Sequence, residues 1–196
     1  MKNKFTLYLL LLSAIIVTSC TDKKKPQRYI TESSGNINSI SLVADNLVWE
    51  GSVGETVREI FAAPLLGLPQ DEPIFSIRQI PEQVFDGFAT KNRLILKLER
   101  TDSTGITYLK DVYAKPQTVV LIKGQSDKEL INLLNEHQQK IINAFNKEEV
   151  NEKLRRINKS LLTDEQMEQD LGFKIDIPSA YRIALSEDNF YWVRKS

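Results

Sequence analysis

Two residue types that often carry chemistry in proteins occur once each in this sequence, as Cys20 and His137. A single histidine excludes a metal site built from several imidazoles and leaves one candidate general base. His137 lies three residues after Leu134 and four before Ile141, on or beside the apolar face of a predicted helix. No GxSxG motif offers it a nucleophile, so we predict a structural role for His137.

Carboxylates are the other groups that could act as acids, bases or ligands. They gather at Asp71 with Glu72, and at Glu165, Glu168 and Asp170. Such groups could serve a glycosidase or a calcium site, but neither has the spacing of an EF-hand loop. The sequence therefore predicts no metal and no cofactor, and it identifies no catalytic residue.

Aromatic side chains form a further candidate site, at Trp49, Tyr181, Phe190, Tyr191 and Trp192. They could stack against a sugar ring if at least two of them shared an exposed face. Tyr191 alternates with Phe190 and Trp192, so these two sets point to opposite faces of a strand. We favour core packing over a sugar platform for these residues.

Cys20 ends a segment that is typical of an export signal. Two lysines precede the apolar run Phe5–Val17, which is shorter than the roughly 20 residues of a membrane-spanning helix. Val17, Thr18 and Ser19 before Cys20 resemble the lipobox of bacterial lipoproteins, in which small residues admit the signal peptidase. The resemblance implies cleavage after Ser19 and lipidation of Cys20.

The chain then divides into a signal peptide at 1–19, a lipidated cysteine with a flexible tether at 20–36, and a folded domain at 37–196. The tether is polar and lysine-rich and cannot bury a core. The folded domain has no cysteine, which excludes disulfides and thiolate metal sites within it.

Charge excludes one class of partner. The chain has 26 basic and 26 acidic side chains, and loss of Lys2 and Lys4 with the signal peptide leaves 24 against 26, a net charge of −2. A balanced surface gives no field to attract nucleic acid, so we expect no nucleic-acid partner.

Hydrophobic periodicity predicts strands and two amphipathic helices in the folded domain. One helix follows Gly51, with an apolar stripe at Val53, Val57, Ile60 and Phe61. A longer helix begins at the capping box Ser126-Asp127-Lys128-Glu129. The predicted strands are 37–43, 74–80, 93–99, 106–113, 118–123, 175–177, 181–185 and 190–193.

These elements predict an α+β fold, with an antiparallel sheet packed against one long amphipathic helix and a shorter N-terminal helix. The turn at 101–105 predicts a hairpin between the strands 93–99 and 106–113. The last strand runs almost to Ser196, so its edge needs a covering element.

Four stretches resemble an uncharacterised family of Bacteroidota envelope lipoproteins catalogued as a domain of unknown function. They are Val48–Gly54, Pro69–Phe75, Asp111–Thr118 and Pro178–Ile183. The resemblance covers most of the chain after Ile37 and implies that this chain is shorter than its relatives at its C-terminal end. It brings no activity and no site residue.

Together these features predict a lipid-anchored protein of the bacterial cell envelope, on the outer membrane and facing the periplasm. We expect it to bind or scaffold an envelope protein or glycan rather than to act as an enzyme. The alternative is a carboxylate-based hydrolase acting on envelope glycans. A pocket with two facing carboxylates would favour the hydrolase, and an apolar patch would favour the binder.

Overall fold

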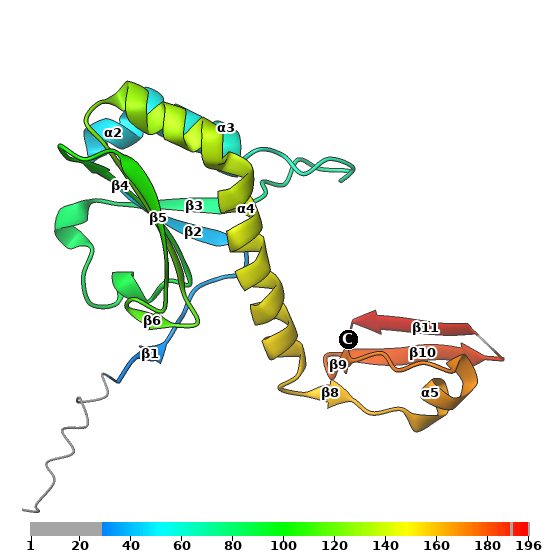
Figure 1. The fold of residues 1–196 in the computed structure, drawn as a ribbon. Coiled ribbons are helices and arrows are strands. Elements are labelled where there is room, and N and C mark those ends of the chain that lie inside the picture. Colours follow the sequence, from blue (N-terminus) through cyan, green and yellow to red (C-terminus); the bar gives the residue numbers. More distant parts are fainter. Residues whose placement is uncertain (1–28, 189, 196) are drawn as a thin grey trace, which may run out of the picture.

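The computed structural model describes residues 29–188 and 190–195. The predicted signal peptide, Cys20 and the recognition residues Val17, Thr18 and Ser19 lie outside the described residues. A mixed α and β body is followed by a smaller C-terminal unit at the far end of helix α4, Asp127–Ile157 (Figure 1). The structure thus confirms the predicted mixture of helices and strands and the predicted long helix. Among the described residues, no helix is both long and apolar enough to cross a membrane.

A five-stranded sheet in the order β3, β2, β4, β7, β5 forms the centre of the body. Its strands are β2 (Ser39–Val43), β3 (Ser76–Ile80), β4 (Leu94–Arg100), β5 (Gly105–Lys110) and β7 (Thr118–Gly124). The first four strands in this order are parallel, and only β5 runs antiparallel to its neighbour. The predicted antiparallel sheet is therefore wrong. The predicted hairpin is wrong too, because β7 lies between β4 and β5 and pairs with both.

Burial of both sheet faces explains the parallel arrangement. Strands that are covered on both sides consist of near-continuous apolar runs rather than alternating ones. In β4, Leu94, Leu96 and Leu98 face the main core, whereas Ile95 faces the opposite side together with Val43 and Val119. Crossover connections, rather than tight turns, then join the parallel strands.

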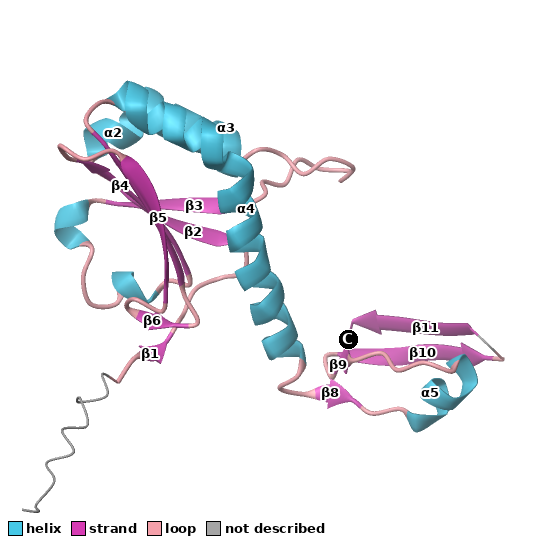
Figure 2. Ribbon diagram, viewed as in Figure 1, coloured by secondary structure: helices cyan, strands magenta, loops and turns pink. Residues whose placement is uncertain are grey.

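Helices α2 (Asn46–Glu50) and α3 (Ser52–Phe61) lie with the first half of α4 on one side of the sheet (Figure 2). Helix α3 buries the predicted stripe, and α4 contributes Leu130, Leu134, Ile141 and Phe145 to the same core. The predicted cap is confirmed, since the Ser126 hydroxyl accepts a hydrogen bond of 3.3 Å from the Glu129 amide. The second half of α4 runs past the sheet toward the C-terminal unit (Figure 1).

Short elements cover part of the other sheet face. They are the 3₁₀ helices η1 (Glu82–Val84) and η2 (Ala89–Lys91), and the two-residue strands β1 (Thr31–Glu32) and β6 (Ala114–Lys115). Strand β1 pairs in parallel with β6, and Ser34 forms a bridge with Asn92. The segment 31–36, assigned to the flexible tether, is thus hydrogen-bonded to the body.

The C-terminal unit contains β8 (Leu161–Leu162), α5 (Glu165–Leu171), β9 (Ile177–Pro178), β10 (Tyr181–Glu187) and β11 (Phe190–Lys195). Strands β10 and β11 form an antiparallel hairpin, and α5 meets it where the Tyr191 hydroxyl donates a hydrogen bond to Asp170. This unit adds the only longer antiparallel pair besides β5 and β7 among the described residues.

Candidate functional site

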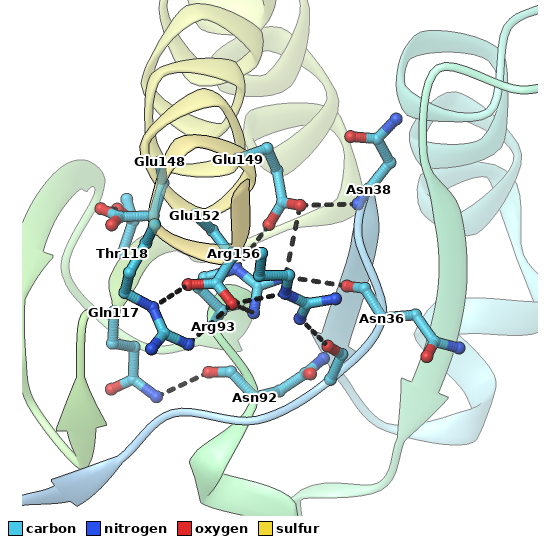
Figure 3. Close-up of polar contacts among 12 residues, drawn as sticks. Asn36, Asn38, Asn92, Arg93, Gln117, Thr118, Glu148, Glu149, Glu152 and Arg156 are labelled. Atoms are coloured by element: carbon cyan, nitrogen blue, oxygen red, sulfur yellow. Dashed lines mark hydrogen bonds and ion pairs between the residues drawn. The ribbon is translucent and has the colours of Figure 1, made fainter. Parts of the chain in front are cut away.

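The amino ends of the parallel strands surround a group of buried charges. Arg93 directly precedes β4 and is 1% exposed, and Glu149 on α4 is also 1% exposed. The Arg93 Nε donates to Glu149 Oε1 at 2.8 Å, and Glu149 Oε2 accepts from the backbone N–H of Asn38 at 2.7 Å (Figure 3). Helix α4 therefore carries its carboxylates to the point where the strands begin.

Glu152, one turn further along α4, is 2% exposed and lies 3.7 Å from the Arg93 guanidinium. Arg155 and Arg156 each donate to its carboxylate at 2.7 Å. The hydrogen bond from Arg155 is the largest cause that lowers the pKa of Glu152 to about 2; burial opposes it, and Arg156 and Arg93 add to it. Glu152 is thus held as a carboxylate among three guanidinium groups.

Glu148 completes the group on the β7 side. Its Oε2 accepts from the Thr118 hydroxyl at 2.8 Å and from the Lys110 ammonium. Each of these three glutamates therefore has a charged or hydrogen-bonding partner. Networks of this kind shift pKa values without any catalytic role, and we assign the cluster a structural function.

Glu152→Gln should lower the free energy of unfolding by about 1.5–3 kcal/mol at pH 7, because Arg93, Arg155 and Arg156 lose an ionised partner. The carboxyl pKa rises from about 2 in the folded chain to its ordinary value of 4.5 on unfolding. Its contribution is therefore complete above pH 4.5 and lost as the pH falls toward about 2. The difference in unfolding free energy between wild type and Glu152→Gln should therefore become smaller as the pH falls. Urea unfolding of both proteins from pH 7 to pH 2 measures this decrease.

Glu136→Gln, an acid-to-amide exchange on an exposed part of the same helix, is the matched control. Its stability difference from wild type should not change in this way with pH. A stability difference between wild type and Glu152→Gln that stays constant down to pH 2 contradicts the expected linkage.

The segment that leads into β2 is fixed by this cluster. The Arg93 guanidinium donates to the Asn36 carbonyl at 2.9 Å, and the Arg156 guanidinium donates to the Gly35 carbonyl at 3.1 Å. Gly35 has a φ of 108°, and a Cβ there would lie 2.1 Å from the Asn92 Oδ1. Only glycine allows this close approach, which brings residues 34–36 beside Asn92.

A hollow of about 390 Å³ opens next to this segment, on the sheet face opposite the long helices. It is lined by Ser34, Gly35, Asn36, Ser39, Ser41, Arg78, Ile80, Val84, Phe88, Ala89 and Asn92. Its volume is within the range of small-molecule sites. We call it the β2–β3 pocket, because those two strands form its floor.

The lining of the β2–β3 pocket combines polar and apolar groups. Arg78 is its only charged residue, and the Asn92 amide donates to the Ser41 hydroxyl at 2.6 Å. Val84 and the 75%-exposed Phe88 stand at its edge. Polar side chains thus outnumber apolar ones in this lining, and polar groups that converge on a pocket can fix the orientation of a ligand.

A second hollow of about 270 Å³ lies at the carboxyl ends of β2 and β4 and is lined in part by Asp45, Glu82, Glu99 and Arg100. Ligands of open parallel sheets often bind where neighbouring connections diverge. Here, however, the Lys97 ammonium lies 2.8 Å from Glu82 and 2.7 Å from Glu99. Burial acts to lower the pKa of Lys97, but these two carboxylates outweigh it and raise the pKa. The charges of this hollow largely neutralise one another.

The candidates from the sequence do not converge on either hollow. His137 lies on α4, with its Nε2 3.9 Å from Glu136. Asp71 and Glu72 occupy the exposed loop between α3 and β3, and Glu168 and Asp170 lie on α5. Within residues 29–188 and 190–195, no three acidic, histidine or cysteine side chains are grouped to hold a metal ion.

The aromatic residues divide between two environments. Trp49 packs against the core, with the Arg58 guanidinium 4.4 Å from its ring centroid. Phe190 and Trp192 are 58% and 53% exposed, and Tyr181 is exposed too, so the expected core packing is wrong for these three. As predicted from the alternation, Tyr191 points the other way, toward Asp170 on α5.

The mostly parallel sheet, with helices on one face and a ligand-sized pocket on the other, defines a mixed α/β domain. The chain belongs to the family described as a domain of unknown function (DUF8532), whose model matches residues 33–158. That range contains the central sheet, the buried charges and both hollows, and it leaves out the C-terminal unit. No curated protein and no solved structure matches the chain. The expected kind of family is confirmed, while the Bacteroidota lipoprotein origin stays a prediction.

Proposed function

We propose that this protein is a lipid-anchored binding protein of the bacterial cell envelope, which holds a ligand in the β2–β3 pocket. The observation that carries the proposal is the lining of that pocket. Among the residues that the structure describes, the lining contains one cation, several neutral polar groups and no carboxylate or imidazole. Such a surface can orient a ligand, but it offers no general base for hydrolysis.

The anchor in this proposal is Cys20 in its lipobox setting, after Val17, Thr18 and Ser19. Several acyl chains, at about 0.8 kcal/mol per buried methylene, hold a protein at a bilayer almost permanently. We place the protein on the outer membrane, facing the periplasm. Its partners there are an envelope protein or glycan, and nucleic acid is not among them.

A carboxylate-based hydrolase acting on envelope glycans is the alternative function. The observation in its favour is the smaller hollow, which Asp45, Glu82 and Glu99 help to line. A glycosidase needs one carboxyl as proton donor and a second as nucleophile or base. Because Lys97 contacts both Glu82 and Glu99, neither is free for such a role, and we place binding ahead of hydrolysis.

Cys20→Ala tests the anchor. We expect the variant to lose palmitate labelling and to leave the membrane fraction, because the thioether cannot form. Thr21→Ala, at the neighbouring position, should label and fractionate as the wild type does. Unchanged labelling and fractionation of Cys20→Ala would overturn the proposed anchoring.

Ala89→Trp tests the pocket, because the indole would fill part of its volume. Lipidated wild type and variant are captured from envelope fractions, and bound proteins, glycans and small molecules are identified by mass spectrometry. A component held by the wild type and lost from Ala89→Trp supports the proposal. Ala180→Trp, on the exposed surface of the C-terminal unit, is the control and should keep that component. Identical recovery by all three proteins, or no reproducible recovery, argues against it.

A further inference from the structure

We infer that the β2–β3 pocket takes a ligand with an anionic group, a carboxylate or a phosphate, next to an apolar group. The inference rests on the proposed function, since it names the ligand class of the same pocket. Its basis is the placement of Arg78, Ser41 and Asn92 relative to the apolar edge.

Arg78 is positioned by the register of β2 and β3. It is the cross-strand partner of Ser41, while Val43 is paired with Ile80 on the same face. Within the described part of the chain, Arg78 has no ion pair, and no carboxylate lines the pocket. An anion placed here gains a charge-assisted hydrogen bond from a guanidinium and meets no like charge, whereas a cation finds no counter-ion.

Ser41 adds a hydroxyl donor. Its side chain is 2% exposed, and its oxygen accepts the 2.6 Å hydrogen bond from the Asn92 amide. A hydroxyl that accepts from an amide keeps its own proton to donate. The hydroxyl proton of Ser41 and the guanidinium of its neighbour Arg78 are therefore available to the same acceptor oxygens.

Apolar side chains form a further part of the wall. Ile80 is buried in the sheet, and Val84 and Phe88 are exposed at the edge. An exposed aromatic ring in the same pocket as a guanidinium suits a ligand with a flat apolar part attached to its anionic group. A small aromatic acid has both features.

The test uses the full-length lipidated chain in nanodiscs, titrated calorimetrically with three probes of similar shape: benzoate, phenyl phosphate and neutral benzamide. We expect at least one anion to bind about tenfold or more tightly than benzamide. The tighter anion identifies the carboxylate or the phosphate as the natural group. Arg78→Gln should weaken the binding of that anion about ten- to a hundredfold. Arg182→Gln in the C-terminal unit should leave its affinity unchanged.

The outcomes separate the two proposals. If benzamide binds as tightly as both anions, or if Arg78→Gln has no effect while Ala89→Trp abolishes binding, the pocket stands and the anionic ligand class is overturned. If no probe binds above empty nanodiscs, the anionic ligand class is also overturned, and the capture experiment with Ala89→Trp still decides whether the pocket binds another ligand. If an anion binds Ala89→Trp as tightly as the wild type, the pocket is not its binding site. Coincident unfolding curves for wild type and Arg78→Gln confirm that the variant folds.

Discussion

Arg93→Met should lower the free energy of unfolding by about 3–5 kcal/mol at pH 7, the cost of removing one partner from a buried ion pair. Methionine fills much of the same space but leaves the Glu149 carboxylate buried without its cation. Glu152 keeps Arg155 and Arg156, so most of the loss falls on Glu149. Urea unfolding followed by circular dichroism measures the difference.

Arg182→Met is the matched control, because that side chain is exposed on the hairpin and its loss should cost about 0.5 kcal/mol or less. The double variant Arg93→Met/Glu149→Leu should recover much of the lost stability, since an apolar replacement of both partners removes the uncompensated charge. A cost below about 1 kcal/mol for Arg93→Met, or no recovery in the double variant, contradicts a buried pair.

Phe145→Ala should destabilise the protein by about 3–5 kcal/mol, the usual cost of removing a buried phenyl ring. Phe145 is fully buried between α4 and the sheet and meets Phe75 edge to face, with ring centroids 6.1 Å apart. Both the apolar contacts and the aromatic pair are lost together. Thermal and urea unfolding of the purified variant test this expectation.

Phe173→Ala provides the comparison, because its ring is exposed in the C-terminal unit and contributes nothing to the main core. We expect a cost within about 0.5 kcal/mol for that change. Equal effects of the two substitutions would show that α4 does not pack on the sheet as described.

Element positions follow from local patterns, and here local patterns were sufficient. The stripe of α3, the Ser126 cap of α4 and the strands β2, β3, β4, β5 and β7 all lie where periodicity and capping place them. These features depend on residues within one or two turns of each other. The sequence alone is enough to locate them.

Strand order depends on distant partners, and there the prediction failed. The turn at 101–105 joins β4 to β5 in sequence, but β7 occupies the place between them. The run Leu94–Leu98 could have indicated a parallel strand, since its apolar residues occupy both faces and are typical of a strand buried on both sides. A half-buried antiparallel strand would alternate apolar and polar residues.

The residues of the buried charge cluster and of the β2–β3 pocket were missed for a different reason. Arg93, Glu149 and Glu152 look like ordinary surface charges in the sequence, and the Arg93–Glu149 pair spans 56 residues. Arg78 and Ser41 become neighbours only through the register of two parallel strands. The one local hint is that Arg93 directly precedes an apolar run.

The chain ahead of β2 has a mechanical consequence. Tension applied at Tyr29 passes first through the two-residue pair of β1 and β6, and then reaches Asn36 and Asn38, which Arg93 and Glu149 hold. A force on the segment 29–38 is therefore resisted by the buried ion pair of Arg93 and Glu149. The same force also acts on residues 34–36, which line the β2–β3 pocket. Tension in the segment 29–38 and a ligand in the pocket therefore act on the same stretch of backbone.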